Sequence, residues 1–388
     1  MDRAGRLVNF AVTCLAQFPV APPVADAQMP VLFVSSPTGI LRLEDVTGDD
    51  DYLDFGEVAV YATLPGANLG PLAATTESLM AADIFAPIVW VARDLNDDGD
   101  ALDFGELTCY LDESSCGSSG AWIAMAAEPI GGLMLADVDG HLFRATDTNG
   151  DGDALDFGEC VAVASGLTAP RGLSIRPDGA VLVSQDSMAT PVVILEDRNG
   201  DGDFLDFAEH LSYAESAGPG GDIVVTDQWL AFLLDRSRLS ILRLQDLTQD
   251  GDALDAGEIV THADPIADAV AMTGDESGRQ FIASSGPSGI IRMVHDANGD
   301  GDALDFGEVI VVATDLGDVQ SVAAAPASIP CIAGDANQDG SVTPADVPVF
   351  ADALTGQSTI AMCALDFNGD GAADGRDITA FVAAVLDP

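Results

Sequence analysis

Oxygen-bearing side chains recur in this sequence at a fixed spacing. The pattern Asp-x-Asn/Thr-x-Asp-Gly-Asp-x-Leu-Asp-Phe-Gly-Glu occurs six times, with single departures in some copies. Alternate positions carry carboxylate or amide oxygens, and the glycine at position 6 permits a sharp turn that lets them converge on one point. This pattern predicts a site for a hard cation. The copies begin at Asp45, Asp94, Asp147, Asp197, Asp246 and Asp296.

Calcium is the cation that suits these loops, because it accepts about six to eight oxygen ligands whereas magnesium retains more of its waters. The alternative interpretation is a solvated acidic hairpin that keeps the protein soluble. It is disfavoured because so many carboxylates within one short loop repel one another, and a turn needs no such density. The predicted ligands in these six loops are Asp45, Thr47, Asp49, Asp51, Asp54, Glu57, Asp94, Asn96, Asp98, Asp100, Asp103, Glu106, Asp147, Asn149, Asp151, Asp153, Asp156, Glu159, Asp197, Asn199, Asp201, Asp203, Asp206, Glu209, Asp246, Thr248, Asp250, Asp252, Asp255, Glu258, Asp296, Asn298, Asp300, Asp302, Asp305 and Glu308.

The first seven positions of each loop resemble the start of an EF-hand loop, and the rest departs from it. Acids stand at positions 10 and 13 instead of 9 and 12. The loop therefore resembles the calcium loops of thrombospondin type 3 repeats, or an EF-like loop within a β-hairpin. We expect positions 10 and 13 to close the site, and Leu at 9 and Phe at 11 to anchor the loop from beneath. Asp50 replaces the position-6 glycine and Ala256 replaces one Phe. An Arg near each loop is interpreted as charge balance.

Residues 331–388 contain two further loops of a different spacing, 1-3-5-7-9-12. Helical patterns follow them, with Val347, Phe350 and Leu354 after the first loop and Ile378, Phe381 and Val385 after the second. This segment resembles a dockerin type I pair, which implies binding of a cohesin domain and attachment to an extracellular scaffold. A small calcium-folded cap or contact domain is the alternative. The predicted calcium ligands are Asp335, Asn337, Asp339, Ser341, Thr343, Asp346, Asp366, Asn368, Asp370, Ala372, Asp374 and Asp377.

The elements around the acidic loops read as short strands. The repeat of about fifty residues contains four of them, most clearly at 172–176, 180–185, 191–196 and 210–214, with Gly and Pro between strands. Such a repeat predicts a mainly β fold, a six-bladed β-propeller. The strand–turn–strand sequence of residues 171–185 resembles the blade sequences of propellers of the NHL and gluconolactonase-like type. We expect 31–35 to begin the first blade and a surplus strand at 319–325 to complete it, which closes the ring.

Composition excludes several partners. The chain of 388 residues has 64 Asp and Glu against 14 basic residues, all Arg, and a net charge of −50, yet it is 48% hydrophobic. The apolar content rules out an acidic disordered chain, and the charge argues against nucleic acid and anionic membranes. No later stretch is long and apolar enough to predict a membrane span.

Residues 1–27 read as a secretory signal, with Arg3 and Arg6 before an apolar stretch and a small-residue cleavage site at 25–27. The predicted domains are therefore a signal peptide at 1–27, a propeller at 28–328 and a dockerin-like module at 329–388. Export permits disulfides. We expect one between Cys331 and Cys363, a local pair of Cys109 with Cys116, and a buried thiol at Cys160.

Three functions are compatible with the sequence. The favoured one is a secreted, calcium-loaded structural or adhesion component that self-assembles or joins a scaffold through its tail. The second is a propeller hydrolase or lyase like the gluconolactonases, although no nucleophile motif or central metal ligand set can be assembled from the sequence. The third is a propeller that binds a glycan. The favoured prediction is therefore non-enzymatic.

Overall fold

The computed structural model describes residues 28–326 except 37–38, 65, 77, 97, 113, 119, 129–130, 207, 216, 227–228 and 276, together with residues 342, 347, 350, 351, 376–378, 381 and 382. The predicted signal peptide, the pair Cys331–Cys363 and nearly all of the tail lie outside these residues. The domain boundaries stay predictions.

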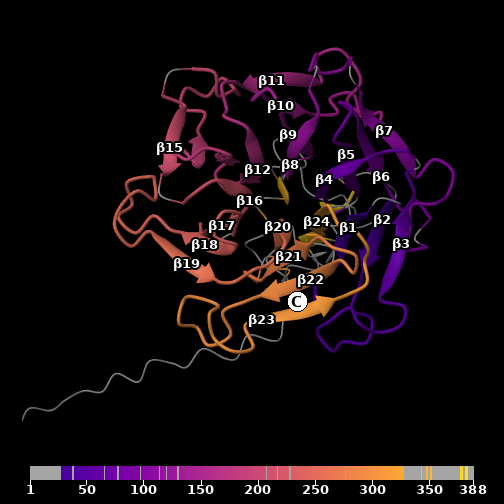
Figure 1. The fold of residues 1–388 in the computed structure, drawn as a ribbon. Coiled ribbons are helices and arrows are strands. Elements are labelled where there is room, and N and C mark those ends of the chain that lie inside the picture. Colours follow the sequence, from indigo (N-terminus) through magenta and orange to yellow (C-terminus); the bar gives the residue numbers. More distant parts are fainter. Residues whose placement is uncertain are drawn as a thin grey trace, which may run out of the picture.

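In the part of the chain that the structure describes, twenty-four strands form six antiparallel sheets of four strands each, arranged as blades around a centre (Figure 1). Blade 1 consists of β24 (Ser321–Ala324), β1 (Leu32–Ser36), β2 (Gly39–Leu43) and β3 (Val58–Ala62). Blade 2 consists of β4 (Leu69–Ala74), β5 (Leu79–Asp83), β6 (Val89–Ala92) and β7 (Leu107–Leu111). Blade 3 consists of β8 (Trp122–Glu128), β9 (Gly132–Asp137), β10 (Leu142–Ala145) and β11 (Cys160–Ala164).

The other three blades repeat this order from the centre outwards. Blade 4 consists of β12 (Pro170–Ile175), β13 (Val181–Gln185), β14 (Val192–Leu195) and β15 (His210–Ala214). Blade 5 consists of β16 (Gly220–Val225), β17 (Ala231–Asp235), β18 (Ser240–Leu244) and β19 (Ile259–Ala263). Blade 6 consists of β20 (Ala269–Gly274), β21 (Gln280–Ser284), β22 (Ile290–Val294) and β23 (Val309–Ala313). The predicted six-bladed propeller is confirmed.

Burial follows the position of a strand within its blade. Every residue of the second strands β1, β5, β9, β13, β17 and β21 is buried, because neighbouring sheets cover both of their faces. The outermost strands are more exposed in their first three residues and buried at their last two, as in β3, although β11 begins with the buried Cys160. The apolar core therefore consists of clusters lying between adjacent sheets.

The ring closes through β24. This strand pairs antiparallel with β1, with Ser321 opposite Ser35 and Ala324 opposite Leu32, and so completes blade 1 from the far end of the array. The prediction of a surplus closing strand is confirmed, and its observed bounds are slightly shorter than expected. Because β24 pairs with one edge of β1 and β2 with the other, the first strand of the array has no free edge that could pair with another chain.

The cysteine prediction was wrong in the propeller. Cys116 forms a disulfide with Cys160, with 4.9 Å between their Cα atoms, and Cys109 is free. The Cys109 thiol lies on β7 and donates to the Leu111 carbonyl oxygen at 3.2 Å. The connection from β7 to β8 instead brings Cys116 beside the first residue of β11. Neighbours in the sequence were therefore a poor guide to neighbours in space.

Two predicted helical positions of the tail meet in the structure. The rings of Phe350 and Phe381 stack with their centroids 3.9 Å apart, and both side chains are buried. Within the part of the chain that the structure describes, no helix has the length and apolar character to cross a membrane.

Candidate metal-binding loops and central channel

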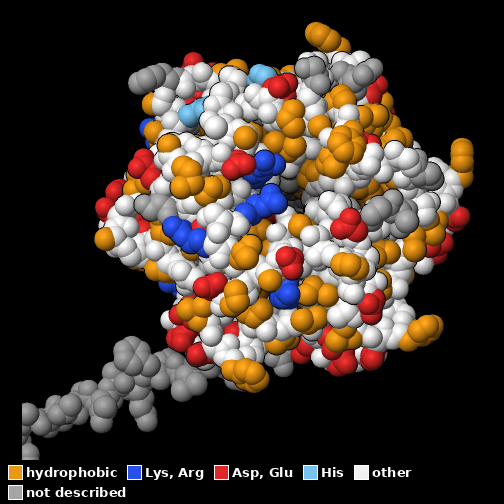
Figure 2. Space-filling model, viewed as in Figure 1, with side chains coloured by type: hydrophobic (Ala, Val, Ile, Leu, Met, Phe, Trp, Pro, Cys, Tyr) orange, Lys and Arg blue, Asp and Glu red, His pale blue; other side chains and the backbone are white. Residues whose placement is uncertain are grey.

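Each acidic pattern forms the connection between the third and fourth strand of its blade. The third loop, for example, links β10 to β11, and the fourth links β14 to β15. These connections lie at the periphery, and acidic side chains are distributed around the rim of the face shown in Figure 2. The carboxylates are thus spaced around the ring and do not converge on its centre.

The aspartate at position 1 organises the first turn of each loop. Asp147 Oδ1 accepts the Gly150 N–H at 2.6 Å, and its Oδ2 accepts the Gly152 N–H at 2.8 Å. Burial alone would raise the pKa of the Asp147 carboxyl, but these N–H groups outweigh it and lower the pKa. The turn needs a left-handed backbone at position 6, where Gly152 has φ 97° and Asp50 of the first loop adopts φ 66°.

The glutamate at position 13 closes each loop from within. Glu159 Oε1 accepts the Thr148 N–H at 2.9 Å, and Oε2 accepts the Asp156 N–H at 3.2 Å. The Thr148 N–H is the largest of the contacts that lower the pKa of Glu159. All six glutamates are at most 3% exposed: Glu57, Glu106, Glu159, Glu209, Glu258 and Glu308. The closing residue predicted from the sequence therefore braces the backbone of the loop.

Positions 3 and 10 meet across four of the loops. The Asn149 amide donates to Asp156 Oδ2 at 2.6 Å, and the pairs Asn96–Asp103, Asn199–Asp206 and Asn298–Asp305 repeat this contact at 2.7, 2.6 and 2.8 Å. In the first loop Thr47 instead donates to Glu57 Oε1 at 3.1 Å. Position 7 is used locally, since Asp153 Oδ1 accepts the Leu155 N–H at 2.9 Å.

The ligand set fits a cation most directly in the first loop. Carboxylate oxygens of Asp45, Asp49 and Glu57 all lie within 4.8 Å of one another, so one ion could contact all three. Asp51 and Asp252, at position 7 of their loops, have raised pKa values, first through burial and then through neighbouring carboxylates, with backbone N–H groups opposing. A bound cation relieves both effects, so the described loop residues suit calcium.

Position 8 proves to be the anchor of the loop, which the sequence analysis missed. Its N–H donates to a carbonyl on the outermost strand of the preceding blade, and its side chain is at most 2% exposed. The six donor and acceptor pairs are Tyr52 with Val312 at 2.7 Å, Ala101 with Tyr61 at 2.8 Å, Ala154 with Tyr110 at 2.9 Å, Phe204 with Val163 at 2.7 Å, Ala253 with Tyr213 at 2.8 Å and Ala303 with His262 at 2.7 Å.

The expectation that Leu at 9 and Phe at 11 lie under the loop was wrong. Phe157 is fully exposed and Leu155 is 38% exposed, and the other described copies are exposed as well. Apolar side chains accordingly protrude at the rim in Figure 2. The Asx turn at position 7 directs position 8 inwards, and positions 9 and 11 then face solvent. A pattern signal existed, since position 8 is always Ala, Phe or Tyr and never polar.

Several arginines near the loops do more than balance charge. Arg93 Nη2 donates to the Gly152 carbonyl oxygen at 3.0 Å, and Arg144 Nη1 donates to that of Gly202 at 2.6 Å. Arg243 contacts Gly301 in the same way. In each case the arginine belongs to one blade and the position-6 glycine to the loop of the next. The boundary between two adjacent blades, here called a seam, is therefore crossed twice: the loop contacts the preceding blade through position 8, and an arginine of that blade contacts the loop.

The predicted tail ligands are almost entirely beyond the described residues. Asp377 alone is described; it is fully buried and its carbonyl oxygen accepts the Phe381 N–H at 3.0 Å. The structure therefore brings position 12 of the second tail loop against the following aromatic residue.

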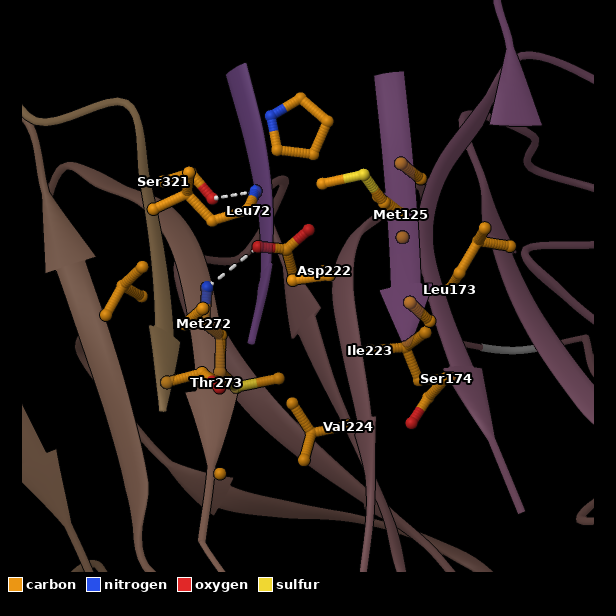
Figure 3. A pocket seen from close by; sticks show the side chains of 18 of the residues that line it. Leu72, Met125, Leu173, Ser174, Asp222, Ile223, Val224, Met272, Thr273 and Ser321 are labelled. Atoms are coloured by element: carbon orange, nitrogen blue, oxygen red, sulfur yellow. Dashed lines mark hydrogen bonds between the residues drawn. The ribbon is translucent and has the colours of Figure 1, made fainter. Parts of the chain in front are cut away.

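The inner strands line a central channel, and most of the side chains that line it are apolar (Figure 3). Asp222 on β16 is the one ionisable side chain among the described residues that line it. Its Oδ2 accepts the Met272 N–H of the next blade at 2.8 Å, as Ser174 accepts Val225 and Thr273 accepts Ala324. Burial raises the pKa of Asp222 to about 6. The carboxylate thus belongs to a series of contacts that satisfy the inner strand edges.

Comparison with known proteins supports two parts of the chain separately. Residues 333–386 match the dockerin type I domain family. A nidogen/laminin complex structure is similar over 76% of this chain and 98% of that chain, at 14% identity and a TM-score of 0.52. A Bacteroides caccae protein of unknown function (11% identity, TM-score 0.48, 76% of this chain and 98% of that one) and a putative gluconolactonase (14%, 0.46, 66% and 81%) also resemble it. No curated protein matches the chain.

The fold and the loops together define the class of this protein. It is a six-bladed β-propeller, mainly β, and each blade carries an acidic loop that forms a backbone hydrogen bond to the preceding blade. Its C-terminal segment is a match to the dockerin type I domain. The likeness to solved propellers at this level of identity establishes the fold alone.

Proposed function

We propose that the protein is an extracellular, calcium-loaded propeller that serves as a structural or adhesion component and joins a scaffold through its tail. The observation that carries this proposal is the dockerin type I match at residues 333–386, joined to a propeller with an acidic loop in every blade. Dockerins imply calcium and a cohesin partner, and they are typical of extracellular assemblies. The disulfide between Cys116 and Cys160 supports an oxidising location.

Calcium has a structural role in this proposal. An ion bound by a loop fixes the turn that holds position 8, and position 8 contacts the preceding blade. Ion binding in six loops therefore stabilises all six seams of the ring. Because the ion binds the folded loop and not the unfolded chain, calcium raises the free energy of unfolding by mass action.

The test measures cohesin binding by the full chain. We expect the calcium-loaded protein to bind at least one of a panel of type I cohesin domains, and the double variant Asp335→Ala/Asp366→Ala to lose that binding. The matched control is Asp147→Ala, which alters a propeller loop and should leave cohesin affinity unchanged. Absence of binding across the panel would refute scaffold attachment.

A second measurement addresses assembly and metal content. Bound calcium is counted by elemental analysis, and purified protein is imaged by electron microscopy with and without a chelator. We expect the chelator to remove the ions, lower the melting temperature and disperse any filaments or sheets. A metal-free protein, or an unchanged melting curve after chelation, would contradict calcium loops in the propeller. A monomer under both conditions would leave scaffold attachment as the mode of assembly.

A further inference from the structure

One seam of the ring departs from the others, where the fifth loop meets blade 4. Position 4 of this loop is Gln249 with φ 62°, whereas Gly150, Gly200 and Gly299 occupy the same left-handed position elsewhere. Ala256 stands where the other five copies have Phe, so the loop is smaller at its tip. Trp229, in the turn between β16 and β17, also has a left-handed backbone, with φ 65°. Strained non-glycine residues concentrate at functional sites.

The same seam lacks the arginine that spans others. At the position of Arg144 in blade 3, blade 4 has Ile194, which is fully buried and points into the core. The space beside Gly251 is therefore a cavity of about 310 Å³. This lies at the lower end of the pocket volumes that hold small ligands, about 300–1,000 Å³. The side chains that line it are Arg176, Tyr213, Trp229, Gln245, Asp246 and Gln249.

These side chains combine an aromatic surface with unused polar groups. The Trp229 ring is 48% exposed, and the guanidinium carbon of Arg176 lies 4.3 Å from the ring centroid. Asp178 holds Arg176 by an ion pair at 2.9 Å, and the buried Arg176 Nε has no hydrogen-bond partner. Within the described chain, the side-chain amides of Gln245 and Gln249 make no hydrogen bond either. Each amide offers both a donor and an acceptor to a ligand.

We propose that this cavity, the Trp229 pocket, binds a neutral carbohydrate. A sugar ring presents C–H groups that pack on an indole, and hydroxyl groups that exchange hydrogen bonds with amides and carboxylates. The side-chain amides of Gln245 and Gln249 line the same cavity as the indole and supply such groups. The net charge of −50 disfavours a polyanionic ligand, and Asp246 lines the pocket itself. The proposal concerns the propeller and goes beyond scaffold attachment by the tail.

The experiment titrates the full-length, calcium-loaded protein with neutral hexasaccharides of cellulose, xylan, mannan and laminarin. Binding is followed by calorimetry and by tryptophan emission, because Trp229 is far more exposed than the buried Trp122. We expect at least one sugar to bind and Trp229→Ala to weaken it about tenfold or more, the effect of losing one aromatic anchor. Gln249→Gly should weaken it too, although it restores the residue of the other loops and relieves the left-handed backbone.

Matched controls separate binding from folding. Trp90→Phe changes a tryptophan of blade 2 away from the pocket, and Phe157→Ser removes an exposed aromatic ring from another loop. Both variants should bind sugar as the unaltered protein does, and Gln249→Gly should melt no lower than it. Failure of every hexasaccharide to bind at millimolar concentration would overturn the proposal. So would an affinity that Trp229→Ala leaves unchanged, even if cohesin binding by the tail succeeds.

Discussion

The backbone N–H of Phe204 lies 2.7 Å from the carbonyl oxygen of Val163 in the preceding blade, and both side chains belong to one buried cluster. At the other five seams the sizes are also complementary. Tyr52 faces Val312, and alanine at position 8 faces Tyr61, Tyr110, Tyr213 or His262. A large side chain from one blade thus always meets a small one from the other. Each seam therefore fills its volume with one larger and one smaller residue.

This complementarity predicts coupling between Ala154 and Tyr110. Ala154→Phe should destabilise the protein by about 1–3 kcal/mol because it overpacks the seam. Tyr110→Val should destabilise it through a cavity. The double variant recreates the pair Phe204–Val163 and should recover most of the loss. Urea unfolding in a double-mutant cycle measures the coupling.

The control for this cycle is Phe157→Ser, three residues from Ala154 in the same loop. Because Phe157 is fully exposed, its replacement should change the free energy of unfolding by less than about 0.5 kcal/mol. Strict additivity of the two seam substitutions would show that the seam does not depend on paired volumes.

His262 should make stability depend on pH. Burial is the main cause of its lowered pKa, with Gln280 opposing through a hydrogen bond and Arg243 lowering it further. The unfolded state then binds a proton more readily, so stability is lost as pH falls below the ordinary histidine pKa of about 6.5. His262→Tyr, which introduces the residue of three other blades, should flatten this part of the profile. Urea midpoints between pH 5 and 7.5, chosen as roughly the range around that pKa, measure the difference, and identical slopes would refute the assignment.

Asp222 should act in the opposite direction. Burial in the channel raises its pKa to about 6, so the folded state holds this proton more tightly than the unfolded chain does. Its contribution is greatest at acid pH and declines as pH rises towards 6. Asp222→Asn keeps an acceptor for the Met272 N–H and removes the charge, so it should gain stability relative to the unaltered protein as pH rises. The exposed Asp139→Asn is the control, and equal pH profiles for both variants would contradict the prediction.

The disulfide between Cys116 and Cys160 should stabilise the propeller. Loss of a cross-link over a separation of 44 residues typically costs about 2–4 kcal/mol, largely because the unfolded chain gains freedom. Cys116→Ser should lower the melting temperature in calcium, whereas Cys109→Ser should have a much smaller effect. Mass spectrometry of a non-reduced digest identifies the linked peptides. A Cys109–Cys116 peptide instead would show that the local pair forms.

The sequence predicted the architecture because its signals were local and repeated. Strand alternation and the recurrence of Asp147-type loops defined six blades, and the surplus strand at the end of the array defined the closure. It did not predict position 8, because the partner of Ala154 is a carbonyl about forty residues earlier in the chain. Nor did it predict the Trp229 pocket, since that depends on Arg176 and Gln249 lying together across one seam. The predicted burial of Leu and Phe at positions 9 and 11 was wrong because it rested on their apolar character alone, and apolar residues can also be exposed.

The closing strand has a mechanical consequence. The predicted tail begins a few residues after β24, which pairs with β1 through only four residue positions. If the tail is held by a scaffold, any pull on the propeller reaches the ring first at this short strand. The seam that completes the circle is then also the one that carries tension. Extraction of β24 by force would open blade 1 before any acidic loop is strained, and would set the load at which a tethered propeller fails.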